Sequence, residues 1–343
     1  MTDDQWRDLL RILDGELLDP LPVGLIIDSP WLAGWHGVSV MDYFSDDGAW
    51  LAANLAAARR FPEMLLVPGF WAEYGMCTEP SAFGAPCVFP ENELPFARKV
   101  LYDYAEVRRL KKPDCKTDGL CPFVVKRLRR AQEEMERQGH RIRFATSRGP
   151  MNIATYLMGH TELLVGVKIS PQEVHQAMEI VTEFTVDWLR HQLAAFPSID
   201  GILVLDDLIG FLGEEDFREF ALPYFRRIAE AVDVRVKALH NDCHGLITAR
   251  LLREMRFNLF NFSHEHGLDE MRRLTGPEVI LLGNVPPRDV LALGTPEDVA
   301  RSAAESLASV DDKRRIILSA GGGTPPGVPS ANIDALCAAV RGD

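Results

Sequence analysis

Eight short apolar runs recur along the 343-residue chain, and helical patterns separate them. Each run is four to six residues long, which suits a strand buried on both faces in a parallel sheet. The runs span residues 23–27, 63–67, 142–145, 201–205, 234–239, 257–262, 279–282 and 315–318. Because no linker rich in Gly, Ser or Pro interrupts the alternation, the pattern favours an α/β fold of the (β/α)8 TIM barrel type over an open doubly wound sheet. We expect a single barrel domain over residues 1–343.

Start signals mark three of the helices. Thr2 precedes an apolar stripe, and Ser170-Pro171-Gln172-Glu173 and Thr295-Pro296-Glu297-Asp298 each place a capping residue before a proline. The segment 71–120 contains five prolines and is too long for a plain strand-to-helix connection. We expect this segment to form a lid or an inserted segment.

Charge and hydropathy exclude several classes of function. Acidic residues exceed basic ones by 13, and the basic residues are scattered, which argues against a nucleic-acid or anionic-membrane partner. No apolar stretch approaches the roughly 18 residues of a transmembrane helix, and the acidic start Met1-Thr2-Asp3-Asp4 is unlike a secretory signal. We expect a cytoplasmic protein whose six cysteines are reduced thiols.

Titratable residues gather where the predicted strands end, which is where a barrel carries its chemistry. Asp206 and Asp207 follow the fourth run, where burial of a carboxyl group suits it to proton transfer. His240 and Asp242 follow the fifth run two positions apart, so both side chains point the same way and can share a divalent metal. The further candidate metal ligands are Cys243, His264 and His266.

Each of these assignments has a structural alternative. His264 and His266 are equally compatible with solvated loop residues, His240 with a hydrogen-bonded core histidine, and one of the two aspartates with a helix cap or a partner of arginine.

Substrate-binding candidates come from the same strand ends. Arg148 is placed to clamp an anionic group, and Trp31 and Trp71 are placed to wall a pocket, although tryptophans also serve as ordinary packing. The chain has no GxSxG or HExxH motif, which removes support for nucleophilic-serine and zincin chemistry.

Four motifs in the C-terminal half carry a family resemblance. They are His240-Asn241-Asp242-Cys243-His244-Gly245, Leu282-Gly283-Asn284-Val285-Pro286-Pro287, Gly294-Thr295-Pro296-Glu297 and Ser319-Ala320-Gly321-Gly322-Gly323-Thr324-Pro325-Pro326-Gly327. In this order they resemble the uroporphyrinogen decarboxylase superfamily. The likeness extends upstream through Arg60-Phe61-Pro62, Gly149-Pro150, Asp206-Asp207 and Pro223-Tyr224, and covers the chain from about Pro22 onward. It implies a (β/α)8 barrel, in agreement with the strand count.

The true decarboxylases of this superfamily differ from the chain at their active site. After the first strand they carry an arginine-rich segment, where this chain has Ile27-Asp28-Ser29-Pro30-Trp31. Their catalytic aspartate corresponds to Gly69 and their late histidine to Gly322, whereas their tyrosine is kept as Tyr156. A polycarboxylate tetrapyrrole would be poorly neutralised without the arginines, so the resemblance favours the other branch of the superfamily.

That branch consists of cobamide-dependent methyltransferases, which use zinc to activate a thiol. Their His-x-Cys pair becomes His240-Asn241-Asp242 here, with Cys243 one place late, and their last-loop cysteine becomes Gly322. Either the metal is held differently, by His240 with Asp242 or Cys243 and with His264 or His266, or this chain has lost the zinc.

We therefore expect a methyl or one-carbon transferase, or a demethylase, that acts on a small molecule and uses zinc or another divalent metal. Asp206, Asp207 and His240 are the predicted catalytic residues, and Trp31, Trp71, Arg148, Tyr156 and Asn284 the predicted substrate-binding residues. A corrinoid would come from a partner protein, and the resemblance implies a homodimer. The alternatives are a decarboxylase or other lyase acting on a carboxylic acid or tetrapyrrole, and a non-catalytic tetrapyrrole or corrinoid binder.

Overall fold

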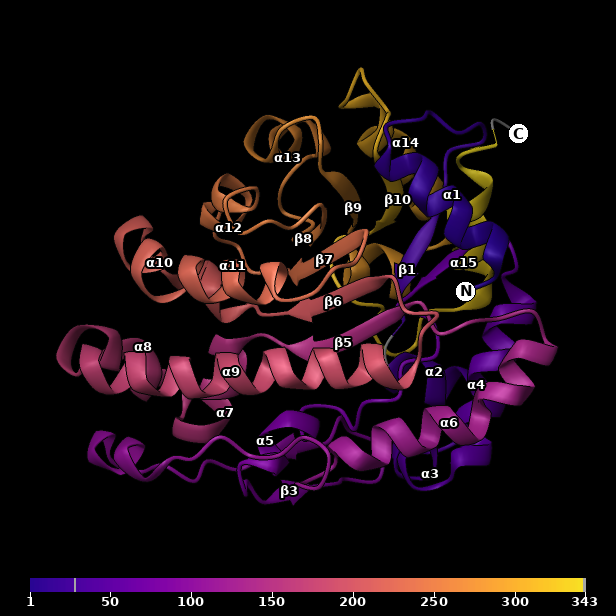
Figure 1. Ribbon diagram of the computed structural model, residues 1–343. Helices are drawn as coiled ribbons and strands as arrows, with labels where there is room; N and C mark the ends of the chain where they lie inside the picture. Colours follow the sequence, from indigo (N-terminus) through magenta and orange to yellow (C-terminus); the bar gives the residue numbers. More distant parts are fainter. Residues whose placement is uncertain (28, 342–343) are drawn as a thin grey trace.

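Eight parallel strands form the centre of the protein in a computed structural model that describes residues 1–27 and 29–341 (Figure 1). Each predicted apolar run overlaps one strand, and four of the strands extend past the end of their run. The strands are β1 (Gly24–Ile26), β2 (Leu65–Val67), β5 (Phe144–Arg148), β6 (Gly201–Leu205), β7 (Val236–Asn241), β8 (Leu259–Phe262), β9 (Ile280–Val285) and β10 (Ile316–Ala320). Asp28, which belongs to the segment compared above with the decarboxylases, lies outside the described residues.

The strands follow one another around a barrel. β5 to β10 pair in sequence order, β1 pairs with β2, and bridges from Val23 to Leu318 and from Ile26 to Gly323 join β1 to β10. All of these pairings are parallel, so every strand ends at the same mouth. The predicted (β/α)8 barrel is confirmed.

Side chains complete the seam between β2 and β5, where no strand pairing is found among the described residues. The amide of Gln192, on α9, accepts from the backbone N–H of Thr146 at 3.1 Å and donates to its carbonyl at 2.8 Å. Two positions along, the Arg148 N–H donates to Glu79 Oε1 at 2.9 Å. These contacts satisfy polar groups on the free edge of β5 that would otherwise be buried without partners.

Helices surround the barrel, and α9 runs the length of the sheet beside β5 (Figure 1). They are α1 (Asp3–Leu13), α2 (Ser29–His36), α3 (Val40–Ser45), α4 (Asp47–Arg60), α5 (Thr78–Ala82), α6 (Cys121–Arg137), α7 (Pro150–Met158), α8 (His160–Ile169), α9 (Pro171–Ala195), α10 (Glu214–Phe220), α11 (Leu222–Glu230), α12 (Ile247–Leu251), α13 (Leu268–Thr275), α14 (Pro296–Ala308) and α15 (Ser330–Ala338). None of these helices is long and apolar enough to cross a membrane.

The first helix packs against the barrel interior. Trp6, Leu9 and Ile12 of α1 join one buried cluster with inward-facing strand residues such as Leu203 and Ile280. Because α1 fills one end of the barrel, the polar residues at the other end remain available for a site.

Two of the three predicted helix starts form the expected caps. Thr2 and Thr295 each make a capping box, with Gln5 and Asp298 respectively. Ser170 begins α9 as predicted but makes no side-chain cap, because its backbone N–H closes α8 on Gly166 and its ψ of 52° departs from the extended conformation of a capping residue.

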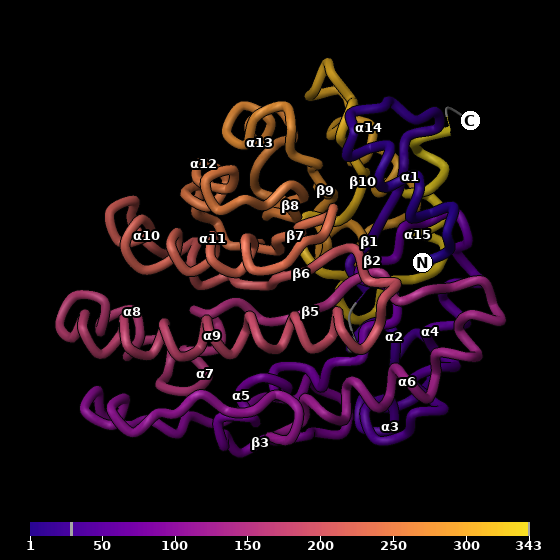
Figure 2. Tube along the Cα trace, in the orientation of Figure 1, coloured from indigo at the N-terminus to yellow at the C-terminus, as the bar shows by residue number. Residues whose placement is uncertain are grey.

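The segment 71–120 folds beside α7 (Figure 2). It contains α5, the antiparallel strands β3 (Cys87–Val88) and β4 (Phe96–Ala97), and the 3-10 helix η1 (Tyr104–Arg109). The 3-10 helix η2 (Leu208–Phe211) follows β6, and the π-helix η3 (Pro287–Ala292) follows β9. A lid function for this segment stays a prediction.

Candidate functional site

Asp207, His240 and Asp242 form a compact group at the barrel mouth. Strand register explains their meeting, since Leu205 at the end of β6 pairs with His240 at the end of β7. His240 Nε2 lies 3.7 Å from Asp207 Oδ1 and 3.9 Å from Asp242 Oδ2, and one ligand atom from each of the three residues lies within 4.8 Å of the others. The spacing suits a divalent cation between two carboxylates and an imidazole.

Asn261 fixes the orientation of the His240 ring. It faces His240 across the β7–β8 pairing, and its Oδ1 lies 2.7 Å from His240 Nδ1. The Asn261 amide nitrogen donates to the carbonyls of Leu282 and Ala320, so its oxygen is the acceptor and the hydrogen-bond network assigns the proton to Nδ1. Nε2 then presents its lone pair to the two aspartates, as in metal sites whose histidines are held by a second hydrogen bond.

Within this group the histidine is buried and the two aspartates are partly exposed to solvent. The side chain of His240 is 10% exposed, whereas those of Asp207 and Asp242 are 38% and 43% exposed. Burial raises the pKa of Asp207; His240 opposes this and the Asp242 carboxylate adds to it. The Asp242 backbone N–H donates to Asp207 Oδ1 at 3.2 Å and holds the two aspartates together.

Asp206 faces away from this group and holds a helix. Its Oδ2 accepts the backbone N–H groups of Met151 and Asn152 at 2.9 and 3.0 Å, at the N-terminus of α7. Burial raises the pKa of Asp206 to about 8, although both N–H groups favour the carboxylate. Its fully buried side chain is directed to α7 and positions that helix, and a catalytic role for Asp206 stays a prediction.

Three of the predicted metal ligands lie outside the group. Cys243 packs against Gly210, where an added Cβ would lie 2.9 Å from the Cys243 Sγ. His266 contacts the His244 carbonyl and Glu270, and His264 is exposed. The structure brings His240 and Asp242 together with Asp207, and it does not bring these three side chains to them.

Two predicted substrate-binding residues, Trp31 and Asn284, form hydrogen bonds within the protein. Trp31 is fully buried, donates to the Val328 carbonyl and stacks on Trp35, so it fastens α2 to the C-terminal loop. The Asn284 amide donates to the His266 carbonyl and accepts from Ser306 Oγ, so it joins β9 to α14 and to the segment after β8. The polar atoms of both side chains are bonded within the protein, and a substrate-binding role for either residue stays a prediction.

Trp71 and Arg148 lie near each other, and Tyr156 lies on α7. Trp71 packs with the barrel core, and the Arg148 guanidinium lies 5.7 Å from its ring centroid. Burial raises the pKa of Tyr156 to about 12, and the charges of Arg148 and Asp207 also act on it.

Sequence reasoning missed Asn261, Glu73 and Glu79. Asn261 is a polar residue inside an apolar run, and its register opposite His240 is the signal that could have revealed it. Glu73 and Glu79 lie in segment 71–120, whose path could not be read from periodicity.

Gly322 leaves room for the Asp242 carboxylate. Its φ is +135°, and a Cβ at this position would lie 2.8 Å from Asp242 Oδ2. We predict that Gly322→Ala costs about 1–3 kcal/mol of stability from backbone strain. It should also weaken zinc binding about tenfold or more, because the carboxylate must leave His240. Thermal unfolding and zinc competition titrations measure the two effects.

Gly327 supplies the matched control. Its φ is +86°, and no neighbouring atom of the described residues would lie within 4 Å of a Cβ at this position. Gly327→Ala therefore imposes backbone strain without displacing a ligand. An equal loss of zinc affinity in both variants would show that the contact with Asp242 is irrelevant.

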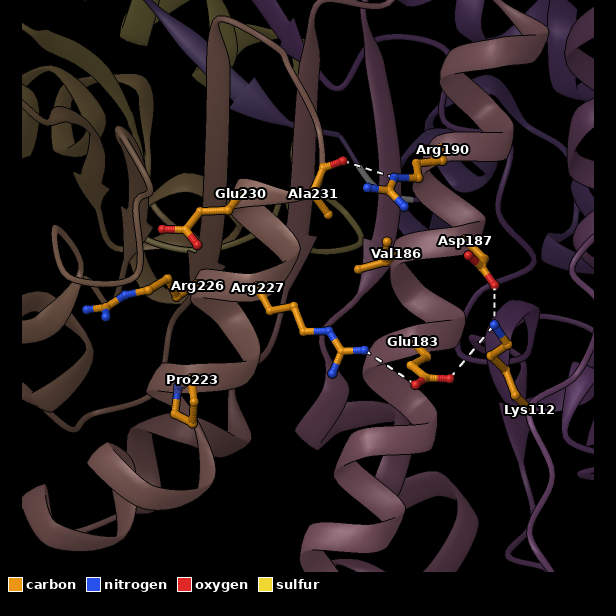
Figure 3. A pocket seen from close by; sticks show the side chains of 10 residues that line it. All are labelled: Lys112, Glu183, Val186, Asp187, Arg190, Pro223, Arg226, Arg227, Glu230 and Ala231. Atoms are coloured by element: carbon orange, nitrogen blue, oxygen red, sulfur yellow. Dashed lines mark hydrogen bonds and ion pairs between the residues drawn. The ribbon is translucent and has the colours of Figure 1, made fainter.

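A groove on the outer surface lies away from this group (Figure 3). It has a volume of about 660 Å³ between α9 and α11, and no predicted site residue lines it. Lys112 pairs with Asp187 at 2.6 Å and Arg227 contacts Glu183, so its charged side chains neutralise one another. The strand ends remain the candidate site.

Comparisons with known proteins agree on the family. The family model described as "Uroporphyrinogen decarboxylase (URO-D)" matches residues 6–342. A uroporphyrinogen decarboxylase of Xylella fastidiosa is 26% identical over 303 residues, covering 84% of this chain and 80% of that protein. One of Methylobacillus flagellatus is 25% identical, covering 77% and 75%.

Solved structures support the fold. A methyltransferase from Methanosarcina mazei has a TM-score of 0.84 at 19% identity and covers 100% of this chain and 99% of its own. A B12-independent methionine synthase from Shewanella has a TM-score of 0.57 at 13% identity, covering 94% and 97%. With a family model that spans nearly the whole sequence and a matching barrel, the chain belongs to the uroporphyrinogen decarboxylase (URO-D) family.

Proposed function

We propose that the protein is a metal-dependent methyl or one-carbon transferase, or a demethylase, acting on a small molecule. The observation that carries this proposal is the group Asp207, His240 and Asp242, with the His240 ring held by Asn261. The barrel shared with a methyltransferase from Methanosarcina mazei supports it as well.

The donor set fits a divalent metal. One imidazole nitrogen and two carboxylates are ligands that zinc and other divalent transition metals accept, and a second hydrogen bond on the histidine is the usual accompaniment of such sites. Bound there, the metal would supply Lewis acidity that makes a thiol or hydroxyl acceptor nucleophilic at neutral pH.

The surrounding residues would position the reactants. Trp71 offers an aromatic surface at the barrel core, and the Tyr156 hydroxyl on α7 offers a hydrogen-bond donor. Asp207 and Asp242 would hold the metal together with His240. Asp206 keeps α7, and with it Tyr156, in place.

The donor in this proposal is a methylated corrinoid carried by a separate protein, or a methylated small molecule. The corrinoid, its partner protein and the homodimer rest on the resemblance of the motifs to the cobamide-dependent branch, and the cytoplasmic location stays an expectation from the sequence.

The runner-up function is a decarboxylase or other lyase with Arg148 as the carboxylate clamp. The curated relatives carry the decarboxylase name, which keeps this function under test. Arg148, however, is buried and already lies 3.9 Å from Glu73.

Metal removal tests the proposal. Wild-type protein, purified without a histidine tag, should contain about one divalent metal per chain and should lose methyl transfer from methylcobalamin or methylated aromatics to thiols after chelation. Activity should return on adding zinc or another divalent metal. A protein that takes up no metal, or that releases carbon dioxide from a carboxylic acid equally well after chelation, would overturn the proposal.

A further inference from the structure

A second surface groove gathers basic side chains at the base of the barrel. It has a volume of about 760 Å³ and lies where β7, β8 and β9 begin, at the opposite end of the strands from Asp207, His240 and Asp242. Five cations and two carboxylates line this basic groove. They are Arg226, Lys237, Arg250, Arg253 and Arg256, with Glu254 and Glu278. Because the whole chain has a net charge of −13, the basic groove differs in sign from the protein around it.

The fold brings these cations together from separate elements. Arg226 lies on α11, Lys237 on β7 and Arg250 on α12, and residues 253–256 belong to the loop that leads into β8. Figure 3 shows the Arg226 side chain directed away from Glu183 on α9. Along the sequence the same cations alternate with acidic residues, so only the tertiary structure produces a positive surface.

Three of the five cations form no ion pair with a carboxylate among the described residues. Arg226 Nε donates to the Glu254 carbonyl at 2.9 Å, and Lys237 Nζ donates to the Ala229 carbonyl at 2.6 Å. The Arg250 side chain is exposed and forms no hydrogen bond or ion pair within the described chain. Since backbone carbonyls carry no net charge, these three cations retain their charge for an external anion.

The two carboxylates of the basic groove are engaged by other arginines. Glu278 lies 3.2 Å from Arg253, and Glu254 lies 3.3 Å from Arg218, which does not line the groove. They are therefore not the counter-charges of the three cations without a carboxylate.

Lys237 is the most buried of these cations in its effect on protonation. Burial lowers the pKa of Lys237, and the Asp233 and Glu230 carboxylates oppose this shift only in part. Glu230 also faces Arg256 at 3.6 Å. An anion bound beside the amine would favour its charged form.

The shape and charge of the basic groove indicate a small phosphorylated ligand. Its volume falls within the range of about 300–1,000 Å³ that small-molecule sites occupy. Guanidinium groups bind phosphate oxygens through paired hydrogen bonds, and several cations suit a ligand with several negative charges. A nucleic acid or an anionic membrane would extend beyond the groove over an acidic surface that repels it.

We propose that the basic groove binds a small molecule with a diphosphate or triphosphate group through Arg226, Lys237 and Arg250. The groove and the group at the barrel mouth lie at opposite ends of the strands, so this inference does not rest on the proposed function.

Calorimetric titration with inorganic tripolyphosphate tests this proposal. Wild-type protein should bind it saturably, and the affinity should fall as the salt concentration rises because the contacts are ionic. Arg250→Gln and Arg226→Gln should each weaken binding about tenfold. Arg301→Gln, which removes an exposed cation from α14, is the matched control and should bind as wild type does.

Two further measurements separate binding from folding and from the barrel mouth. Arg250→Gln should melt within about 2 °C of wild type, because the side chain forms no hydrogen bond or ion pair within the described chain. His240→Ala should bind tripolyphosphate with the affinity of wild type, because His240 lies at the other end of β7 from Lys237.

Several results would overturn the proposal. They are the absence of saturable binding, an equal loss of affinity in Arg250→Gln and Arg301→Gln, and loss of binding in His240→Ala. A further one is tighter binding of single-stranded DNA or phosphatidylglycerol vesicles than of tripolyphosphate, if Arg250→Gln abolishes it. No measurement here involves methyl transfer, so failure of this proposal is distinguishable from failure of the proposed function.

Discussion

His240→Ala is expected to empty the candidate metal site. His240 supplies the central ligand of the group, and its Nε2 is the atom from which both aspartate oxygens are measured at 3.7 and 3.9 Å. Loss of an outer-shell partner costs metal sites about 10–100-fold in affinity, so loss of this ligand should exceed 100-fold. Metal content per chain by mass spectrometry, together with zinc competition titrations, measures the effect.

Variants at the neighbouring positions discriminate between the ligand sets. Asp242→Ala should also lose metal, whereas Cys243→Ala and His264→Ala should retain it, because neither side chain belongs to the group. Asn261→Ala should retain only part of the metal, since it releases the His240 ring from its hydrogen bond without removing a ligand. Retention of stoichiometric metal in His240→Ala would exclude this site.

Gly149→Ala is expected to destabilise the protein strongly. A Cβ on Gly149 would lie 2.4 Å from Asp206 Oδ2 and 2.5 Å from Asp206 Cβ. Asp206 is fully buried and cannot swing into solvent, so the carboxyl group must give up its bonds to Met151 and Asn152. Overpacking and two lost hydrogen bonds together cost about 3 kcal/mol or more, which lowers the melting temperature by about 5 °C or more.

Gly213→Ala is the matched control for this substitution. Both glycines are the N-cap of a helix with nearly the same backbone, at φ −74° and ψ 164° for Gly149 and φ −68° and ψ 164° for Gly213. A Cβ on Gly213 would have no neighbouring atom within 4 Å in the part of the chain that the structure describes. Equal melting temperatures for the two variants would contradict the role assigned to Asp206.

The sequence predicted some residues of the site and not others, and the difference lies in whether their proximity is local in the chain. His240 and Asp242 were predicted together because i and i+2 positions of a strand point the same way, a local property. Asp207 joined them through the pairing of β6 with β7, and Asn261 through the pairing of β7 with β8. Cys243 and His264 looked equivalent to these residues in the sequence, but their side chains are directed elsewhere.

The sequence alone determined the barrel. Apolar runs and helix starts depend on nearest-neighbour chemistry, and the strand count follows from them directly. Only the tertiary structure decided which polar atoms remain available: Trp31 and Asn284 have theirs bonded within the protein, and Glu79 reaches Arg148 across the seam. These outcomes depend on contacts between residues far apart in the chain. A buried polar group needs a hydrogen-bond partner, and the order of the strands determines which partner lies near it.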